Sequence, residues 1–253
     1  MTQTSDRVLY QFAFSHFNEK ARWALDWKGL SCERRSLLPG PHARRIQKLC
    51  GEGRTQVPVL VEDGRVVAGS AAIVAHLDAI APARPLFPDD PDARARAEEW
   101  IDWLDAEIGP AVRLALFHEL LPDTRFASRV FGSAGGGPTG TVYRWLFPRL
   151  VPMLRQRMDI HEESAVKARE IVDAGLRRAA AAAADTGYLV GDRFGAADLT
   201  AASLFMPLFF PKEIPFEMPS LPSPAFEGWL ARWRGHPGEG WIRELWARHR
   251  HPA

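Results

Sequence analysis

The sequence predicts an α/β domain followed by an all-α domain. Short apolar runs alternate with helical patterns over residues 1–80, whereas the patterns after Asp92 are almost wholly helical. Between them, residues 81–91 read APARPLFPDDP, and prolines at this density deny helix continuation. We therefore predict an α/β domain over 1–80, a stiff linker over 81–91 and an all-α domain over 92–253.

The first strand and helix follow from two apolar patterns. The run Arg7 to Phe14 is typical of a strand. After it, Phe17, Ala21, Ala24 and Leu25 fall at helical spacing, and Gly29 is a suitable helix end. A second short strand is predicted over Cys32 to Leu37.

A hairpin and a further helix complete the α/β domain. Val57 to Val61 and Arg65 to Ala68 flank an Asp-Gly pair, which favours a tight antiparallel hairpin. Ser70 then stands as an N-cap before the helical pattern Ala71 to Leu77. The predicted order is β-α-β-(α)-β-β-α.

In the second domain, a long helix is predicted over Arg94 to Leu121, and the alanine run Ala179 to Ala184 is also helical by propensity. The glycine-rich stretch Phe131 to Gly140 is predicted to be a mobile loop that holds no helix or strand. Gly195 and Asp198 resemble a helix capping box, which predicts a role in folding.

The composition favours an ordinary soluble protein. Hydrophobic residues make up 46% of the chain and charged residues 25%, and the formal net charge of +1 argues against a broad nucleic-acid surface. Cys32 and Cys50 have neither disulfide nor zinc-site spacing, so no metal is predicted. The first residues lack an apolar signal segment, and no run approaches the ~20 apolar residues of a membrane span, so we expect a cytoplasmic protein.

Three motifs in order carry a resemblance to a known family. They are Ser15 at the start of the first helix, Val57-Pro58 entering the hairpin and Gly69-Ser70 opening the next helix. This order resembles the serine-type members of the glutathione S-transferase superfamily. The resemblance implies a thioredoxin-like domain that binds glutathione, an all-helical domain that walls the second-substrate site, and a homodimer with a detoxification role.

The resemblance places Ser15 at the position that activates the thiol. A helix N-terminus favours an anion, and a serine hydroxyl there can donate to the glutathione sulfur and hold it as a thiolate. Alternatively, Ser15 is only the N-cap of the helix. Asn18 falls where redox relatives carry a second cysteine, so an internal disulfide cannot form at this turn.

The other predicted contacts to glutathione lie near the hairpin. The resemblance implies a cis Pro58 that turns the Val57 backbone toward the cysteinyl part, although a trans proline beginning an edge strand is the alternative. Ser70 would bind the γ-glutamyl carboxylate. Gly69 departs from the family, where an acid commonly pairs with the γ-glutamyl ammonium. An acid from the partner subunit could compensate, or these acids form an ordinary solvated face; the candidates are Glu98, Glu99, Asp102 and Asp105.

Two further sets of side chains complete the predicted site. The candidates for the glycine carboxylate of glutathione are Gln56, Arg44, Arg45 and His42. The candidates for the apolar second-substrate pocket, whose alternative is simple core packing, are Phe12, Phe14, Phe17, Trp103, Leu116 and Phe117.

The sequence thus predicts an enzyme that adds the glutathione thiolate to a small apolar electrophile, with glutathione as co-substrate. Two alternatives remain open at this point. One is a non-catalytic ligand-binding or interaction protein on the same fold, and the other is a glutathione-dependent isomerase or lyase.

Overall fold

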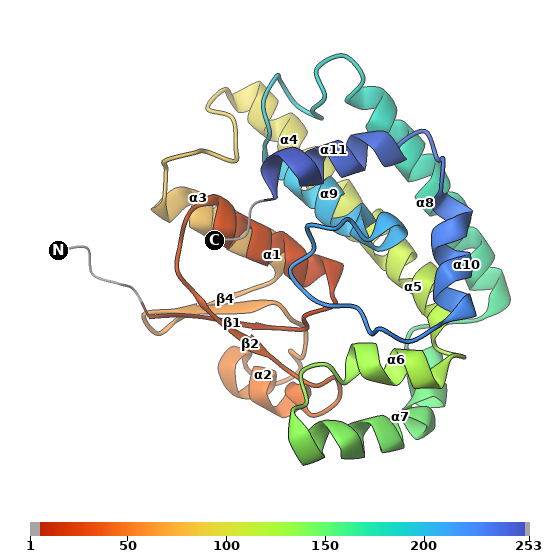
Figure 1. The fold of residues 1–253 in the computed structure, drawn as a ribbon. Helices are drawn as coiled ribbons and strands as arrows, with labels where there is room; N and C mark the ends of the chain where they lie inside the picture. The colour runs from red at the N-terminus through yellow and green to blue at the C-terminus, as the bar shows by residue number, and fades with distance from the viewer. Residues whose placement is uncertain (1–5, 251–253) are drawn as a thin grey trace.

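The computed structural model describes residues 6–250, with a sheet and three helices at the N-terminal side and helices beyond it (Figure 1). The N-terminal elements are, in order, β1 (Arg7–Gln11), α1 (His16–Trp27), β2 (Glu33–Ser36), α2 (His42–Cys50), β3 (Val59–Glu62), β4 (Arg65–Ala68) and α3 (Ser70–Ile80). The predicted order of elements is confirmed, including the helix between the second strand and the hairpin.

The sheet has the strand order β2-β1-β3-β4, with β1 parallel to β2 and antiparallel to β3. Successive side chains of a strand point to opposite faces. Leu9 accordingly packs with α1 and α3, whereas Val8 and Tyr10 pack with Ile46 of α2. The sheet therefore lies between two helical layers, which is the predicted thioredoxin-like domain.

Several boundaries differ from the sequence prediction by a few residues, and two of these differences lie near the cavities. Strand β1 ends at Gln11 rather than Phe14, because the carbonyls of Phe12 and Ala13 accept hydrogen bonds from the Arg22 guanidinium at 3.4 and 2.8 Å instead of from a neighbouring strand. The N-cap of α3 is Gly69, so Ser70 is the first residue inside that helix.

Residues 81–90 connect α3 to the helical part of the chain without a helix or strand. The elements that follow are α4 (Pro91–Trp103), the π-helical turn η1 (Leu104–Ile108), α5 (Gly109–Leu120), α6 (Thr124–Phe131), α7 (Gly137–Arg157), α8 (Glu162–Ala182), α9 (Ala196–Phe209), α10 (Pro224–Trp233) and α11 (Glu239–His249). The predicted long helix is thus real, but a π turn interrupts it. The capping box is also present, since Asp198 accepts from the Gly195 and Leu189 N–H groups at 3.0 and 2.7 Å.

The predicted glycine-rich loop is shorter than expected, because α7 already begins at Gly137. Pro138 is tolerated in the first turn of a helix, where its missing N–H would have no partner. A Cβ on Gly140 would lie 1.9 Å from the Gly135 carbonyl oxygen, so glycine lets the helix approach the chain that precedes it. The prediction that residues 137–140 hold no element is wrong.

Helix α1 is packed by both parts of the molecule (Figure 1). Its Trp23 ring lies 4.7 Å from the Trp246 ring of α11, and the Trp23 indole N–H donates to the His249 carbonyl at 3.1 Å. Its Glu19 is fully buried between two arginines, Arg22 and Arg250, at 2.6 Å from each. The N-terminus of α1 is therefore held by contacts on the sheet side and on the helical side.

Candidate active site

The turn that carries Ser15 is built by the backbone. The Ser15 carbonyl accepts the Glu19 N–H at 2.9 Å, and the Ser15 N–H donates to the Phe12 carbonyl at 3.2 Å. Ser15 occupies the N-cap position of α1, but its side chain makes no capping hydrogen bond. The hydroxyl is therefore available at a helix N-terminus, where a negative charge is favoured.

The buried side chain of Asn18 stabilises this turn. Its side chain is fully buried, and its Oδ1 accepts a hydrogen bond from the Phe12 N–H at 3.4 Å. The residue at the second redox position thus supports the loop between β1 and α1.

Two adjoining cavities meet at this turn. The first, of about 440 Å³, is lined by Ser15 and largely by aromatic and aliphatic side chains. The second, of about 660 Å³, lies at the N-terminus of α3. Both are lined by Phe17, Gln56, Val57 and Arg113, so a ligand in the second cavity can extend to Ser15 in the first.

The second cavity contains the predicted glutathione motifs. The Val57-Pro58 peptide bond is cis, as predicted, and both residues line the cavity. Ser70 is buried in the first turn of α3 and also lines it. Cys50 lies in the same wall, but burial raises the pKa of its thiol, which disfavours the reactive thiolate.

The backbone explains why position 69 has no acidic side chain. Gly69 has φ 95° and ψ 142°, and its N–H donates to the Pro58 carbonyl at 3.0 Å. This region of backbone conformation is strongly disfavoured for any residue with a Cβ. Space is available, since an added Cβ would meet nothing within 4 Å, so the conformation rather than crowding favours glycine.

A carboxylate of the same chain lies in the second cavity. Asp105, in the π turn η1, lines the cavity together with Gly69 and Ser70. Its Oδ2 accepts from the buried Lys20 ammonium at 2.7 Å, whereas its Oδ1 is buried and has no hydrogen-bond partner. The other three acids considered from the sequence, Glu98, Glu99 and Asp102, are exposed.

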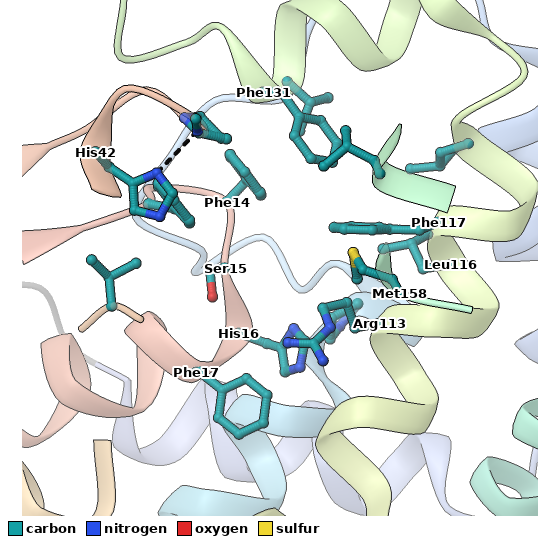
Figure 2. Close-up of a pocket in the computed structure, with 18 of the residues that line it drawn as sticks. Phe14, Ser15, His16, Phe17, His42, Arg113, Leu116, Phe117, Phe131 and Met158 are labelled. Atoms are coloured by element: carbon teal, nitrogen blue, oxygen red, sulfur yellow. Dashed lines mark hydrogen bonds between the residues drawn. The ribbon is translucent and has the colours of Figure 1, made fainter. Parts of the chain in front are cut away.

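Most of the predicted apolar residues line the first cavity. Phe14 packs on Phe131 at 4.7 Å between ring centroids, and Phe117 packs on the same ring at 5.0 Å. Figure 2 shows Ser15 on one side of this cavity and Leu116, Phe117 and Met158 on the other. The predicted residues that line it are Phe12, Phe14, Phe17, Leu116 and Phe117.

The predicted position of Trp103 needs correction. Its indole N–H donates to Glu107 at 3.0 Å, and its ring contacts Trp100 and the Arg178 guanidinium rather than either cavity. The π turn after Trp103 uses one more residue than an α turn between hydrogen-bonded partners. The side chains after it are therefore rotated away from the register of Trp103.

The residues predicted for the glycine carboxylate separate into two groups. His42 and Gln56 line the first cavity, and His42 Nδ1 accepts the Gly40 N–H at 3.0 Å (Figure 2). Arg44 and Arg45 are exposed on α2 and line neither cavity. Arg45 donates to the Tyr10 hydroxyl at 2.7 Å on the opposite face of the sheet from α1.

The site residues that were missed from the sequence include His16 and Arg113. The His16 ring is buried beside Arg113, and its Nε2 lies 3.0 Å from the Gly109 carbonyl, to which it donates (Figure 2). Burial, and then the charge of Arg113, lower the pKa of His16 to about 3, against the effect of that hydrogen bond. The sequence signal for Arg113 was a single charge within the apolar stretch Ala111 to Leu116.

Over residues 6–250, no cluster of His, Cys, Asp and Glu side chains is suited to hold a metal ion. The same range contains no helix with the length and apolar character needed to cross a bilayer.

Comparisons with known proteins agree with this arrangement. The family models "Glutathione S-transferase, N-terminal domain" and "Glutathione S-transferase, C-terminal domain" match residues 9–85 and 142–237. Glutathione S-transferase 1 of Dianthus caryophyllus is 33% identical over 120 residues, which cover 46% of this chain and 53% of that protein. The matches to this and another curated plant relative span about half of each relative's length.

Solved structures show the same fold. Beta-etherase LigF from Sphingobium sp. strain SYK-6 has a TM-score of 0.60 at 21% identity, over 94% of this chain and 98% of that one. A theta class glutathione S-transferase from Xanthomonas axonopodis pv. citri, crystallised with glutathione, has a TM-score of 0.59 at 23% identity, over 98% of this chain and 99% of that one.

Proposed function

The chain belongs to the glutathione S-transferase superfamily, and from this premise we propose that it is a transferase that adds the glutathione thiolate to small apolar electrophiles. Ser15 holds the sulfur as a thiolate. The observation that carries the proposal is the meeting of the two cavities at Phe17 and Val57, next to Ser15 in the first cavity. A tripeptide in the second cavity would thereby present its sulfur to an electrophile in the first.

Each part of glutathione has a counterpart in the second cavity or at its junction with the first. The Val57 backbone, exposed by the cis Pro58, pairs with the cysteinyl unit in the manner of an added strand. Ser70 and the N-terminus of α3 bind the γ-glutamyl carboxylate. The unpartnered Oδ1 of Asp105 accepts the γ-glutamyl ammonium, and His42 and Gln56 bind the glycine carboxylate.

The reaction needs little from the protein beyond thiol ionisation and proximity. The Ser15 hydroxyl donates to the sulfur, and the N-terminal dipole of α1 adds a favourable potential. The thiol proton leaves to solvent, and the sulfur electron pair forms the new bond to carbon as the leaving group departs with its own pair. His16, whose pKa of about 3 keeps it neutral, adds no positive charge.

We further propose that the protein acts as a cytoplasmic homodimer in detoxification. The support is the membership of the superfamily, to which these properties belong. Light scattering during size-exclusion chromatography measures the subunit number directly.

Calorimetric titration with glutathione and turnover of 1-chloro-2,4-dinitrobenzene test the activity. Wild-type protein is expected to bind glutathione and form the conjugate. Ser70→Ala removes a hydrogen bond to a charged group and should weaken binding roughly 10- to 100-fold. Thr141→Ala, at an exposed position outside both cavities, should bind like wild type. Failure of the wild-type protein to bind millimolar glutathione would overturn the proposal.

A further inference from the structure

We propose that Arg113 binds an anionic group of the second substrate, so that this site selects aromatic electrophiles that carry a carboxylate. The reaction step rests on the proposed function, whereas the anion binding can be tested without it.

Arg113 is a cation at the junction of the two cavities, and it has no acidic partner in the described part of the chain. It lies on α5 and lines both. Its Nε is buried and has no hydrogen-bond partner, and among residues 6–250 no ion pair to its guanidinium is found. The side chain is half-buried overall, and removing its Nε from water without a partner is unfavourable, so a bound anion would offset that part of the desolvation cost.

The two almost completely buried arginines, Arg22 of α1 and Arg250 of the C-terminal segment, have acidic partners, unlike the half-buried Arg113. Arg22 and Arg250 both contact the Glu19 carboxylate at 2.6 Å. At Arg113, by contrast, burial lowers the pKa of the guanidinium and no acidic side chain opposes this effect. The guanidinium nevertheless stays protonated at neutral pH, so its charge is uncompensated.

The surrounding groups do not supply the missing negative charge. His16 beside it is neutral, and its Nε2–H is used by the Gly109 carbonyl. Asp105 lines the second cavity but is paired with the Lys20 ammonium at 2.7 Å. Within residues 6–250 no acidic side chain pairs with Arg113, so we infer that its counter-ion arrives with a ligand.

The position of Arg113 on its helix assigns the anion to the second substrate. Leu116 and Phe117 follow it by three and four residues and share its face of α5, and both line the first cavity (Figure 2). The remaining walls include Phe14, Phe131 and Met158. The pocket is thus suited to a flat apolar body with one anionic group at the arginine, and the guanidinium fork matches a carboxylate.

The test uses an acid and its neutral ester, 4-chloro-3,5-dinitrobenzoate and its methyl ester. With either compound, the glutathione sulfur forms a bond to the ring carbon that bears chlorine, and chloride leaves with the bonding pair. The carboxyl group is para to the chlorine, so acid and ester differ in intrinsic reactivity, and recognition is measured by comparing each variant with wild type on the same compound. The variants are Arg113→Met, which removes the charge, and Arg113→Lys, which keeps it. Arg129→Met, at an exposed arginine of α6 that lines neither cavity, is the matched control.

Arg113→Met should lower kcat/KM for the benzoate roughly 10- to 100-fold and leave that for the ester nearly unchanged. Arg113→Lys should retain part of the wild-type kcat/KM for the benzoate, and Arg129→Met should retain the wild-type kcat/KM for both compounds. Because the lost charge had no partner, Arg113→Met should melt at or above the wild-type temperature. An equal fall for both electrophiles would assign Arg113 to glutathione itself and overturn the proposal, as would no change for either.

If wild-type protein turns over neither compound, the proposed function fails, and the anion site is then judged by binding alone. The probes are 3,5-dinitrobenzoate and its methyl ester, which lack the leaving group, followed by quenching of tryptophan fluorescence. Tighter binding of the acid that is lost in Arg113→Met supports the site. Equal binding of acid and ester overturns it.

Discussion

Asp105 contributes a carboxylate where the backbone at position 69 favours glycine. One of its oxygens is paired with Lys20, and the other is buried without a partner in the second cavity. Asp105→Asn should therefore weaken glutathione binding by about one to two decades, because the γ-glutamyl ammonium loses a charged acceptor. Calorimetric titration measures the change.

Lys20→Met is the control for this variant, because it breaks the same ion pair but leaves the carboxylate. Burial lowers the pKa of Lys20, so the uncharged side chain should be tolerated. The affinity of the Lys20→Met variant for glutathione should equal or exceed that of the wild-type protein. If both variants weaken binding equally, the ion pair matters for the shape of the cavity and Asp105 is not the acceptor.

His16 makes the free energy of unfolding depend on pH. Its pKa falls from 6.5 to about 3 on folding, so between these pH values the unfolded state binds the proton and the folded state does not. The free energy of unfolding should therefore decrease as pH falls through this window, by up to ~1.4 kcal/mol per pH unit. His16→Gln keeps an N–H donor for Gly109 without titrating, and its stability should fall less. Urea unfolding of both proteins across the window would show parallel losses if this account is wrong.

Asp198 changes the free energy of unfolding in the opposite direction to His16, over an overlapping range of pH. Burial raises its pKa from 3.8 to about 7, against the hydrogen bonds from Leu189 and Gly195. Its contribution to stability is complete below pH 3.8 and is lost as pH rises through about 7. The wild-type curve therefore combines opposing effects, and the difference between His16→Gln and wild type isolates the histidine.

At the scale of elements, the start of α5 positions the ring of Phe17, which lines both cavities. A Cβ on Gly109 would lie 2.3 Å from the Cζ atom of Phe17. Gly109→Ala should displace this ring, weaken glutathione binding and cost ~1–3 kcal/mol of stability by overpacking. Gly228→Ala, in α10 with open space around it, should instead be neutral or stabilising by ~0.5–1 kcal/mol. Unchanged glutathione affinity in Gly109→Ala would show that the ring position is unimportant.

Features that are determined by residues adjacent in the sequence could be predicted. The Asp-Gly turn between β3 and β4 follows from a short motif, whereas the cis bond at Pro58 was implied by the family resemblance. We could not predict from the sequence which side of the long helix carries Trp103. The prediction assumed an uninterrupted α-helix, whereas a π turn follows Trp103 and changes the register of the later side chains. The importance of Arg113 also escaped, because the absence of a partner is a property of the folded molecule alone.

At the scale of the whole molecule, a buried ion network joins the C-terminal segment to the active-site helix. Arg250 contacts Glu19 at 2.6 Å and Asp26 at 2.8 Å, and all three side chains are almost completely buried. Arg250→Met should lower the free energy of unfolding by ~3 kcal/mol or more, because it leaves two buried carboxylates with fewer partners. Chemical denaturation followed by circular dichroism measures this.

Lys167→Met is the matched control, since its partner Glu163 is also exposed, and its effect should stay within ~0.5 kcal/mol. A similar small effect for Arg250→Met would mean that the C-terminal segment does not stabilise α1.

The position of α1, fixed by both parts of the molecule, brings its N-terminus and Ser15 to the meeting point of the cavities. The most direct test of this account is the pKa of the glutathione thiol in the complex, followed by the ultraviolet absorbance of the thiolate as pH is varied. In the wild-type complex this pKa should lie below that of free glutathione, and Ser15→Ala should raise it by roughly 1–2 units with little loss of affinity. A bound thiol whose pKa is the same in wild type and Ser15→Ala would contradict the role assigned to Ser15.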